Sequence, residues 1–218
     1  MYTMLSSIYV RVRTYYPLNL MVWLTRYLIA FAFIPSGMKK ILGQRFTNIG
    51  TDNPIGYFFE ALFRTGMYWN FLGWGQLIAA ILMMTQLFST LGNLIFFFIV
   101  SNIFIITVSM HFTGTCLIAL LMLFASTCLL LWDANRLQYI IVRKGFLEIR
   151  QDVKLPEASM LWQISGILLF IASVSYTLID NVIKTNHLQL FLGFFILIVI
   201  TVVATIILEL RDRKLKSN

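Results

Sequence analysis

Charged side chains are scarce in this chain, because Lys, Arg, Asp and Glu make up only 12% of its 218 residues. A soluble domain carries about 25%, and here 59% of the residues are hydrophobic. That balance excludes an ordinary soluble domain and predicts a protein surrounded by lipid. The net charge of +8 does not indicate a nucleic-acid partner, because the basic residues lie in loops and tails between apolar runs.

Cysteine and histidine are also rare, with two of each. Cys116 and Cys128 share one apolar run, and on a helix they would lie about 18 Å apart, too far for a disulfide. The chain has no Cys-x-x-Cys pair, no nucleophile–base set and no nucleotide-binding fingerprint. We therefore expect no metal site, no intrinsic cofactor, and neither hydrolytic nor nucleotide-driven chemistry.

Six uninterrupted apolar runs reach the ~20 residues that a helix needs to cross a bilayer. They show no strand-like alternation, so the predicted fold class is all-α, a polytopic helical membrane protein. The first twenty residues lack a signal-peptide pattern, which predicts an uncleaved N-terminus. The predicted spans are 18–42, 68–88, 91–111, 113–132, 161–180 and 188–209.

Basic residues predict the orientation of these spans. They are concentrated in the 134–160 connection and the C-terminal tail, so both should be cytoplasmic, with the N-terminus on the same side (N-in/C-in) of the inner membrane. The predicted organisation is an N-terminal segment 1–17, a four-helix bundle 18–133, a basic connection 134–160, two further spans 161–210 and a basic tail 211–218.

The 43–67 connection is an exception, because it would be external yet contains Arg45 and Arg64. We interpret these arginines as parts of a structured or functional segment rather than topology signals. Asn53-Pro54 opens a turn. The aromatic residues after it suit either a short interfacial helix or a loop that packs on the bundle.

Three polar side chains fall in the middle layer of the predicted bundle. At ~1.5 Å per residue, Arg26 lies roughly 12 Å above the cytoplasmic boundary, and Gln76 and Asn102 about 16–18 Å above it. An ionisable group in a span is costly without a partner or a task. Two interpretations remain open: a polar clamp that ties helices together, or a site that binds a polar head group such as a quinone carbonyl.

Other polar residues extend this candidate site. Asn102, Ser109 and Thr113 share one helix face by their spacing of seven and four, and His111 lies near the external surface. Lys39 is a further candidate at that mouth. Asp133 ends the fourth span, where a long arginine could reach it, and Gly37 with Pro35 indicates a local irregularity.

Four stretches together resemble the DoxX-like membrane proteins over roughly residues 20–140. They are Arg26 to Gly43 with its Ser-Gly-Met-Lys-Lys cluster, Phe71-Leu-Gly-Trp-Gly-Gln76-Leu-Ile-Ala-Ala, Asn102 to Thr115, and Leu131-Trp-Asp133-Ala-Asn-Arg136-Leu. The resemblance implies a four-helix membrane bundle distantly similar to a methylamine-utilisation maturation protein and to vitamin K epoxide reductase. Related chains resemble the small subunit of a thiosulfate:quinone oxidoreductase.

Two departures limit what the resemblance implies. Many relatives have a glutamate where this chain has Gln76, and the catalytic cysteine pair of the epoxide reductase is missing. The leading hypothesis is an integral component of a redox assembly that contacts quinone near Arg26, Gln76 and Asn102, with electrons from a partner subunit. The alternatives are a non-enzymatic scaffold or maturation factor, and, more weakly, a small-solute transporter. Whether the chain is itself an enzyme, and whether it forms homo-oligomers, stays open.

Overall fold

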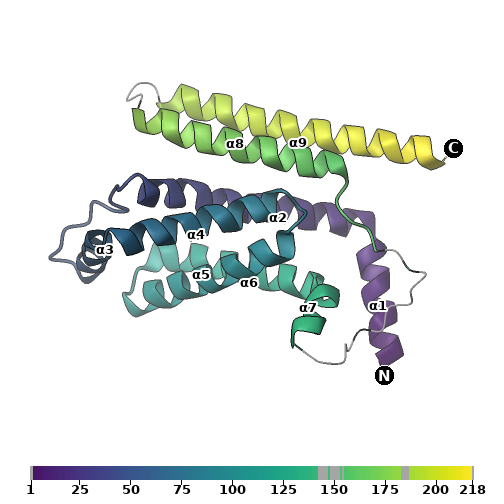
Figure 1. The fold of residues 1–218 in the computed structure, drawn as a ribbon, viewed down its shortest axis with the longest axis horizontal. Coiled ribbons are helices and arrows are strands. Elements are labelled where there is room, and N and C mark those ends of the chain that lie inside the picture. Colours follow the sequence, from purple (N-terminus) through teal and green to yellow (C-terminus); the bar gives the residue numbers. More distant parts are fainter. Residues whose placement is uncertain (1, 142–146, 148–152, 154, 183–186, 218) are drawn as a thin grey trace.

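A computed structural model describes residues 2–141, 147, 153, 155–182 and 187–217, and the regular elements within these ranges are all α-helices (Figure 1). The elements in chain order are α1 Tyr2–Thr14, α2 Tyr16–Ile41, α3 Pro54–Arg64, α4 Met67–Met84, α5 Ser89–Ser109, α6 Thr113–Trp132, α7 Ala134–Ile141, α8 Met160–Val182 and α9 His187–Ser217.

Six of these helices, α2, α4, α5, α6, α8 and α9, are long and apolar enough to cross a membrane. The all-helical, multi-pass prediction is therefore confirmed. Both termini lie at the same end of the long helices, together with α1 and α7, while α3 lies at the opposite end (Figure 1). We call these the α1 end and the α3 end.

The core forms where α2 and α4 pack side by side. Gly37 and Gly73 permit this approach, because a Cβ added to either would lie 3.0 or 2.8 Å from the carbonyl oxygen of the other. Aromatic and aliphatic side chains of the neighbouring helices complete the core, with Phe33 stacked on Phe96 of α5 at 4.1 Å between ring centroids.

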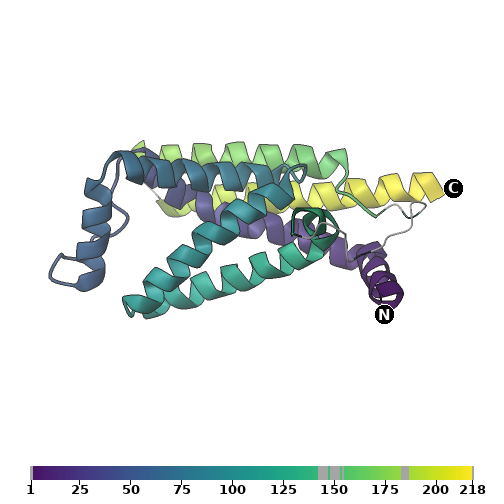
Figure 2. The same cartoon turned by 60° about the horizontal axis from the view of Figure 1, so that its bottom comes forward.

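α8 packs against both α2 and α4, and α9 packs on α8. Trp162 of α8 is fully buried, and its ring centroid lies 5.2 Å from that of Trp23. The Tyr27 hydroxyl donates to the carbonyl oxygen of Trp162. The last two spans are therefore part of the core, while the α5–α6 hairpin diverges from α2 and α4 toward the α3 end (Figure 2).

Several boundaries differ from the sequence prediction. Residues 1–17 and 134–160, expected as plain connections, contain α1 and α7, and α9 continues to Ser217 through the predicted tail. Ser89 and Thr90 were expected to link two spans but open α5, so the link is 85–88. Most of the basic residues of the 134–160 connection lie outside the described residues.

Of the two alternatives for the residues after Asn53-Pro54, the structure has the short helix, α3. The Asn53 side chain caps it by accepting a hydrogen bond from the Ile55 amide at 3.1 Å, and proline suits the first turn because its missing N–H would have no helical partner. α3 runs across the ends of the long helices (Figure 2).

Candidate functional site

Arg26, in the first half of α2, forms a buried ion pair level with the α1 ends of α4 and α6. Its side chain is only 6% exposed, and its Nη2 donates to Asp133 Oδ1 at 3.0 Å and Oδ2 at 2.8 Å. Its Nη1 donates to Gln86 Oε1 at 3.0 Å. Charge-assisted hydrogen bonds between arginine and carboxylate are among the stronger contacts, so Asp133 ties α2 to the end of α6, and Gln86 ties it to the end of α4. The sequence expectation that an arginine reaches Asp133 is confirmed.

The position of Asp133 needs such a partner. It is the C-cap of α6, where the helix dipole disfavours a negative charge. Thr90 at the start of α5 donates to Asp133 Oδ2 at 3.0 Å. Arg13 of α1 approaches Asp133 Oδ1 with Nη1 at 3.5 Å. One carboxylate is therefore shared by two arginines and a hydroxyl group.

Gln86 reaches Arg26 from a backbone conformation that glutamine rarely adopts, with φ at 58°. Its Nε2 also donates to the Trp23 carbonyl oxygen at 3.1 Å. A non-glycine residue in the left-handed region costs free energy and persists where the surroundings require it. Here the hydrogen bonds of the Gln86 side chain to Arg26 and Trp23 of α2 hold the residue in this conformation.

α1 closes the site from the side. Arg13 is 5% exposed and its guanidinium carbon lies 5.0 Å from the Trp132 ring centroid. The Tyr9 hydroxyl donates to the Trp132 carbonyl oxygen at 2.6 Å. Burial lowers the pKa of Arg13 and raises the pKa of Tyr9.

These residues line a cavity of about 440 Å³ at the α1 end, which we call the polar cavity. Its described lining contains three arginines and two carboxylates, and the Arg136–Glu157 pair lies at its more exposed side at 2.6 Å. Within the described part of the chain, Arg13 Nε, Arg26 Nε and Asn19 Oδ1 are buried without a hydrogen-bond partner. The lining is Arg13, Asn19, Trp23, Arg26, Gln86, Leu87, Trp132, Asp133, Arg136, Pro156, Glu157, Ala158 and Gln163. The residues that line the cavity thus carry an excess of positive charge, and three of them have a buried polar atom without a partner in the described part of the chain.

A second polar cluster lies at the α3 end of α2. Lys40 is 8% exposed and its Nζ donates to Gln76 Oε1 at 3.0 Å and to Ser36 Oγ at 2.7 Å. The same nitrogen lies 5.1 Å from the Phe46 ring centroid and 5.0 Å from that of Trp69. These rings and the C-terminal end of α2 favour the cation, and no carboxylate contacts it among the described residues.

The three residues expected in one layer are not brought together. Gln76 contacts Lys40 rather than Arg26. Asn102 is exposed on α5, where its Nδ2 donates to the Phe98 carbonyl oxygen of the same helix at 2.8 Å. Arg26 is held by hydrogen bonds across helices, but its partners are Gln86 and Asp133 and not the expected Gln76 and Asn102.

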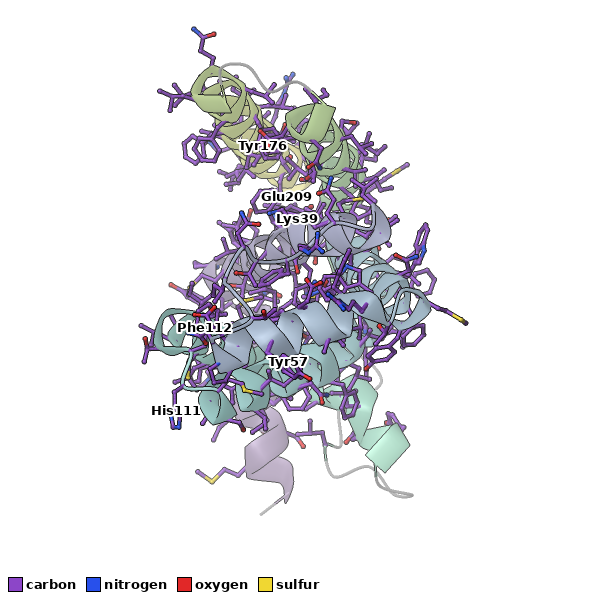
Figure 3. The ribbon with its side chains drawn as sticks, turned by 90° about the vertical axis from the view of Figure 1, so that its left-hand side faces the viewer. Lys39, Tyr57, His111, Phe112, Tyr176 and Glu209 are labelled. Carbon is purple, nitrogen blue, oxygen red and sulfur yellow. The ribbon has the colours of Figure 1, made fainter. Side chains whose placement is uncertain are left out.

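The remaining candidates lie at the α3 end. Lys39, Ser109 and His111 are all exposed, and Figure 3 shows Lys39 and His111 at this end but far apart. His111 has φ at 51° and ends α5, with its amide donating to the Val108 carbonyl and the Phe112 amide to that of Thr107. This arrangement is a Schellman motif, so His111 has a clear role in the backbone turn.

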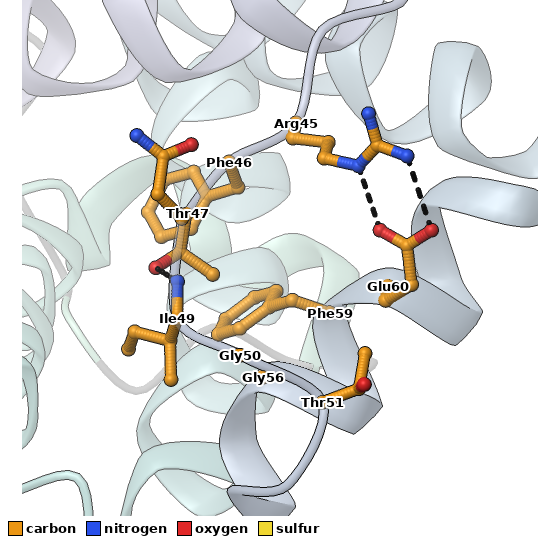
Figure 4. A pocket seen from close by; sticks show the side chains of 10 residues that line it. Arg45, Phe46, Thr47, Ile49, Gly50, Thr51, Gly56, Phe59 and Glu60 are labelled. Carbon is orange, nitrogen blue, oxygen red and sulfur yellow. Dashed lines mark hydrogen bonds and ion pairs between the residues drawn. The ribbon is translucent and has the colours of Figure 1, made fainter.

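A smaller cavity of about 280 Å³ lies between α3 and the segment before it (Figure 4). Glu60 accepts from Arg45 Nε at 2.8 Å and from Arg64 Nε at 3.0 Å. The hydrogen bonds from these two arginines lower the pKa of Glu60 to about 2. Arg45 and Arg64, the basic residues that an external connection was not expected to carry, are therefore both paired within this segment.

An apolar groove of about 620 Å³ lies between α2, α8 and α9. Its described lining is almost entirely apolar and shares no residue with the lining of the polar cavity. The groove is therefore separate from that cavity, and lipid chains suit its lining.

Sequence reasoning missed Arg13, Gln86 and Lys40. Arg13 was assigned to a plain segment, although an arginine shortly before an apolar run suggests a contact with the end of the bundle. Gln86 was placed inside a span, where its polar side chain could have indicated a helix end. Lys39 was chosen instead of Lys40, because the sequence alone does not show which of two neighbouring residues at a helix end points into the protein.

Comparison with known proteins finds no matching family, no similar curated protein and no similar solved structure.

Proposed function

We propose that this chain is an integral membrane component of a redox assembly and binds the head group of a quinone or quinol in the polar cavity. The observation that carries the proposal is the pair of buried arginines, Arg13 and Arg26, which share Asp133 and line a cavity of about 440 Å³. The DoxX-like resemblance of the sequence points to the same class of protein.

The chemistry of the lining suits both redox forms of such a ligand. A quinone carbonyl oxygen accepts hydrogen bonds, and Arg13 Nε and Arg26 Nε are donors without partners in the described part. A quinol hydroxyl donates, and Asn19 Oδ1 is a buried acceptor without a partner there. Excess positive charge in the lining stabilises the negative charge that develops on quinone oxygens during reduction.

The proposed orientation is N-in/C-in in the inner membrane, so the polar cavity would open toward the cytoplasm. The described basic residues at the α1 end, including Arg11, Arg136 and Arg211, support this orientation. At the α3 end, Arg45 and Arg64 share Glu60, which offsets one of their two positive charges. A peripheral partner subunit on the cytoplasmic side would supply or receive the electrons.

Quenching of tryptophan fluorescence by a short-chain benzoquinone tests the proposal, because Trp23 and Trp132 line the cavity. Arg13→Gln retains the Arg26–Asp133 pair and should weaken quinone binding by about tenfold, the loss of one charge-assisted hydrogen bond. Arg64→Gln is the matched control, since it removes an arginine at the other end, and should change nothing. Equal affinity in all three proteins, or no saturable quenching, would falsify the proposal.

A non-enzymatic scaffold or maturation factor is the second candidate. The observation that favours it is that both terminal nitrogens of Arg26 are already engaged, by Asp133 and Gln86. In that case the double variant Arg26→Gln with Asp133→Asn should lower the melting temperature and the recovery of a partner. It should change no ligand signal, because the cavity would bind none.

A further inference from the structure

One face of α5 is exposed at the start of the helix and through its second half. Leu91, Phe98 and Ile105 are 52%, 65% and 61% exposed, and Asn102 and Ser109 are exposed between and after them. These five residues, the α5 face, follow one another at intervals of seven, four, three and four. That spacing places them on a single stripe, with the period of a helix–helix seam.

Asn102 is the unusual member of the α5 face. It lies seven residues before the end of the helix at Ser109, about 10 Å along the axis, and about 20 Å from the other end. It is therefore within the hydrocarbon layer for any placement of α5 across the bilayer. Its Nδ2 donates one hydrogen bond to the Phe98 carbonyl oxygen, and its Oδ1 makes none in the described part of the chain. An amide left in this state against lipid is costly.

The exposed stripe of α6 provides an internal comparison. Leu117, Leu121, Phe124, Cys128 and Leu131 follow the same heptad spacing and are exposed. None of their side chains carries a strong hydrogen-bonding group, so this stripe can face lipid without leaving a polar group unpaired. The amide of Asn102 distinguishes the α5 face from an ordinary lipid-facing surface.

We propose that the α5 face pairs with the α5 face of a second copy of this chain, with the two Asn102 side chains hydrogen-bonded across the symmetry axis. A two-fold interface places the same patch on both sides, so each Asn102 meets a partner with the same chemistry. A carboxamide is self-complementary, because it has an N–H donor and a C=O acceptor. Asparagine within an apolar heptad seam is a known determinant of pairing and register, and amides join helices in membranes.

The pairing leaves the polar cavity untouched. The cavity is built from α1, α2, the link after α4, the end of α6, α7, and residues 156–163, which lead into α8. The α5 face contributes no residue to it. This inference is therefore independent of the proposed quinone function, and either can fail alone.

The experiment measures the monomer–dimer equilibrium of the full chain in phosphatidylcholine vesicles, by single-molecule photobleaching at increasing lipid dilution. Wild type should dimerise, Asn102→Leu should weaken the dimer by about tenfold, and Asn102→Gln should retain most of it. Leu121→Ile on the α6 stripe is the matched control and should leave the dimer unchanged. Asn102 is exposed, so Asn102→Leu should fold normally, and circular dichroism checks this.

Disulfide cross-linking in a background lacking Cys116 and Cys128 locates the interface. Ile105→Cys should cross-link efficiently between copies, and Leu121→Cys should not. A wild-type protein that stays monomeric at the lowest lipid dilution would overturn the proposal. So would a dimer that Asn102→Leu leaves intact, a cross-linking preference for Leu121→Cys, or pairing of the α5 face with a different protein only.

Discussion

α2 carries two buried cations, Arg26 in its first half and Lys40 in its last turn, and the two are stabilised in different ways. Arg26 contacts an amide beyond the end of α4, Gln86, and Lys40 contacts an amide within α4, Gln76. Arg26 also has a carboxylate, Asp133, and lies beside a cavity. Lys40 has two aromatic rings and a helix C-terminus instead. Both cations therefore contact an amide. Only Arg26 also has a counter-ion and an adjoining cavity among the described residues, which makes its surroundings the candidate site.

The difference extends to what each cluster joins. Asp133 connects α2, α5, α6 and α1 through Arg26, Thr90 and Arg13. Lys40 connects α2 with α4, which already pack closely through Gly37 and Gly73, and with the Phe46 ring of the segment after α2. We therefore expect the fold to depend more on Asp133 than on Lys40.

The largest effect should come from Asp133→Asn. It leaves Arg26 and Arg13 buried without their shared carboxylate, and breaking a buried pair in this way costs about 3–5 kcal/mol. Thermal unfolding in mild detergent, followed by tryptophan fluorescence, measures the loss. Asp52→Asn, an exposed carboxylate near α3, is the control, and equal melting temperatures for both variants would contradict the prediction.

Lys40→Met should cost less, about 1–2 kcal/mol, because it removes hydrogen bonds without leaving a buried charge. Gln76 retains Ser36 as a partner, whose hydroxyl donates to Gln76 Oε1 at 3.3 Å. Lys39→Met is the matched control on the exposed side and should stay within about 0.5 kcal/mol of wild type. If Lys40→Met were as harmful as Asp133→Asn, the contrast between the two ends would be lost.

Two helix ends with positive φ should respond in opposite directions to glycine. His111→Gly should stabilise the protein by about 0.5 kcal/mol, because glycine adopts that conformation without strain and the side chain is exposed. Gln86→Gly gains the same relief but loses the hydrogen bonds to Arg26 and Trp23, so it should destabilise by about 1 kcal/mol. Chemical denaturation of both variants gives the signs, and two stabilising substitutions would show that the Gln86 side chain contributes nothing.

The smallest effect is a local dependence on pH at the α3 end. The pKa of Glu60 is lowered to about 2 in the folded protein by Arg45 and Arg64. Its contribution is present above the ordinary pKa of about 4.5 and is lost as pH falls from there through the folded value. Hydrogen exchange of α3, corrected for intrinsic rates, should accelerate over that range. A Glu60→Gln protein should lack this acceleration, and identical pH profiles for the two proteins would refute the assignment.

The sequence predicted the six long helices because each apolar run continues for a full membrane crossing. α1 and α7 were missed, since they are short and polar enough to resemble connections. Depth along a helix correctly suggested that Arg26 could reach Asp133. The depths of Gln76 and Asn102 were wrong, because the link after α4 is level with Arg26. Gln76 therefore lies about 15 Å further toward the α3 end, beside Lys40. The positive φ of Gln86, which aims its side chain at Arg26, has no signal in the sequence.

The contact of Gly37 with Gly73 has a mechanical consequence. Two backbones this close cannot slide past each other, because a shift of one residue would press a side chain into the opposite main chain. Gly166 of α8 is held equally tightly against the end of α4, where an added Cβ would collide with the Met84 carbonyl oxygen. Gly92 of α5 is held in the same way, since an added Cβ would lie 2.8 Å from the Met83 amide nitrogen and 2.9 Å from the Ala79 carbonyl oxygen of α4. α4 is therefore locked against three neighbouring helices, and their register along its axis is set by main-chain contact rather than by side chains that could repack.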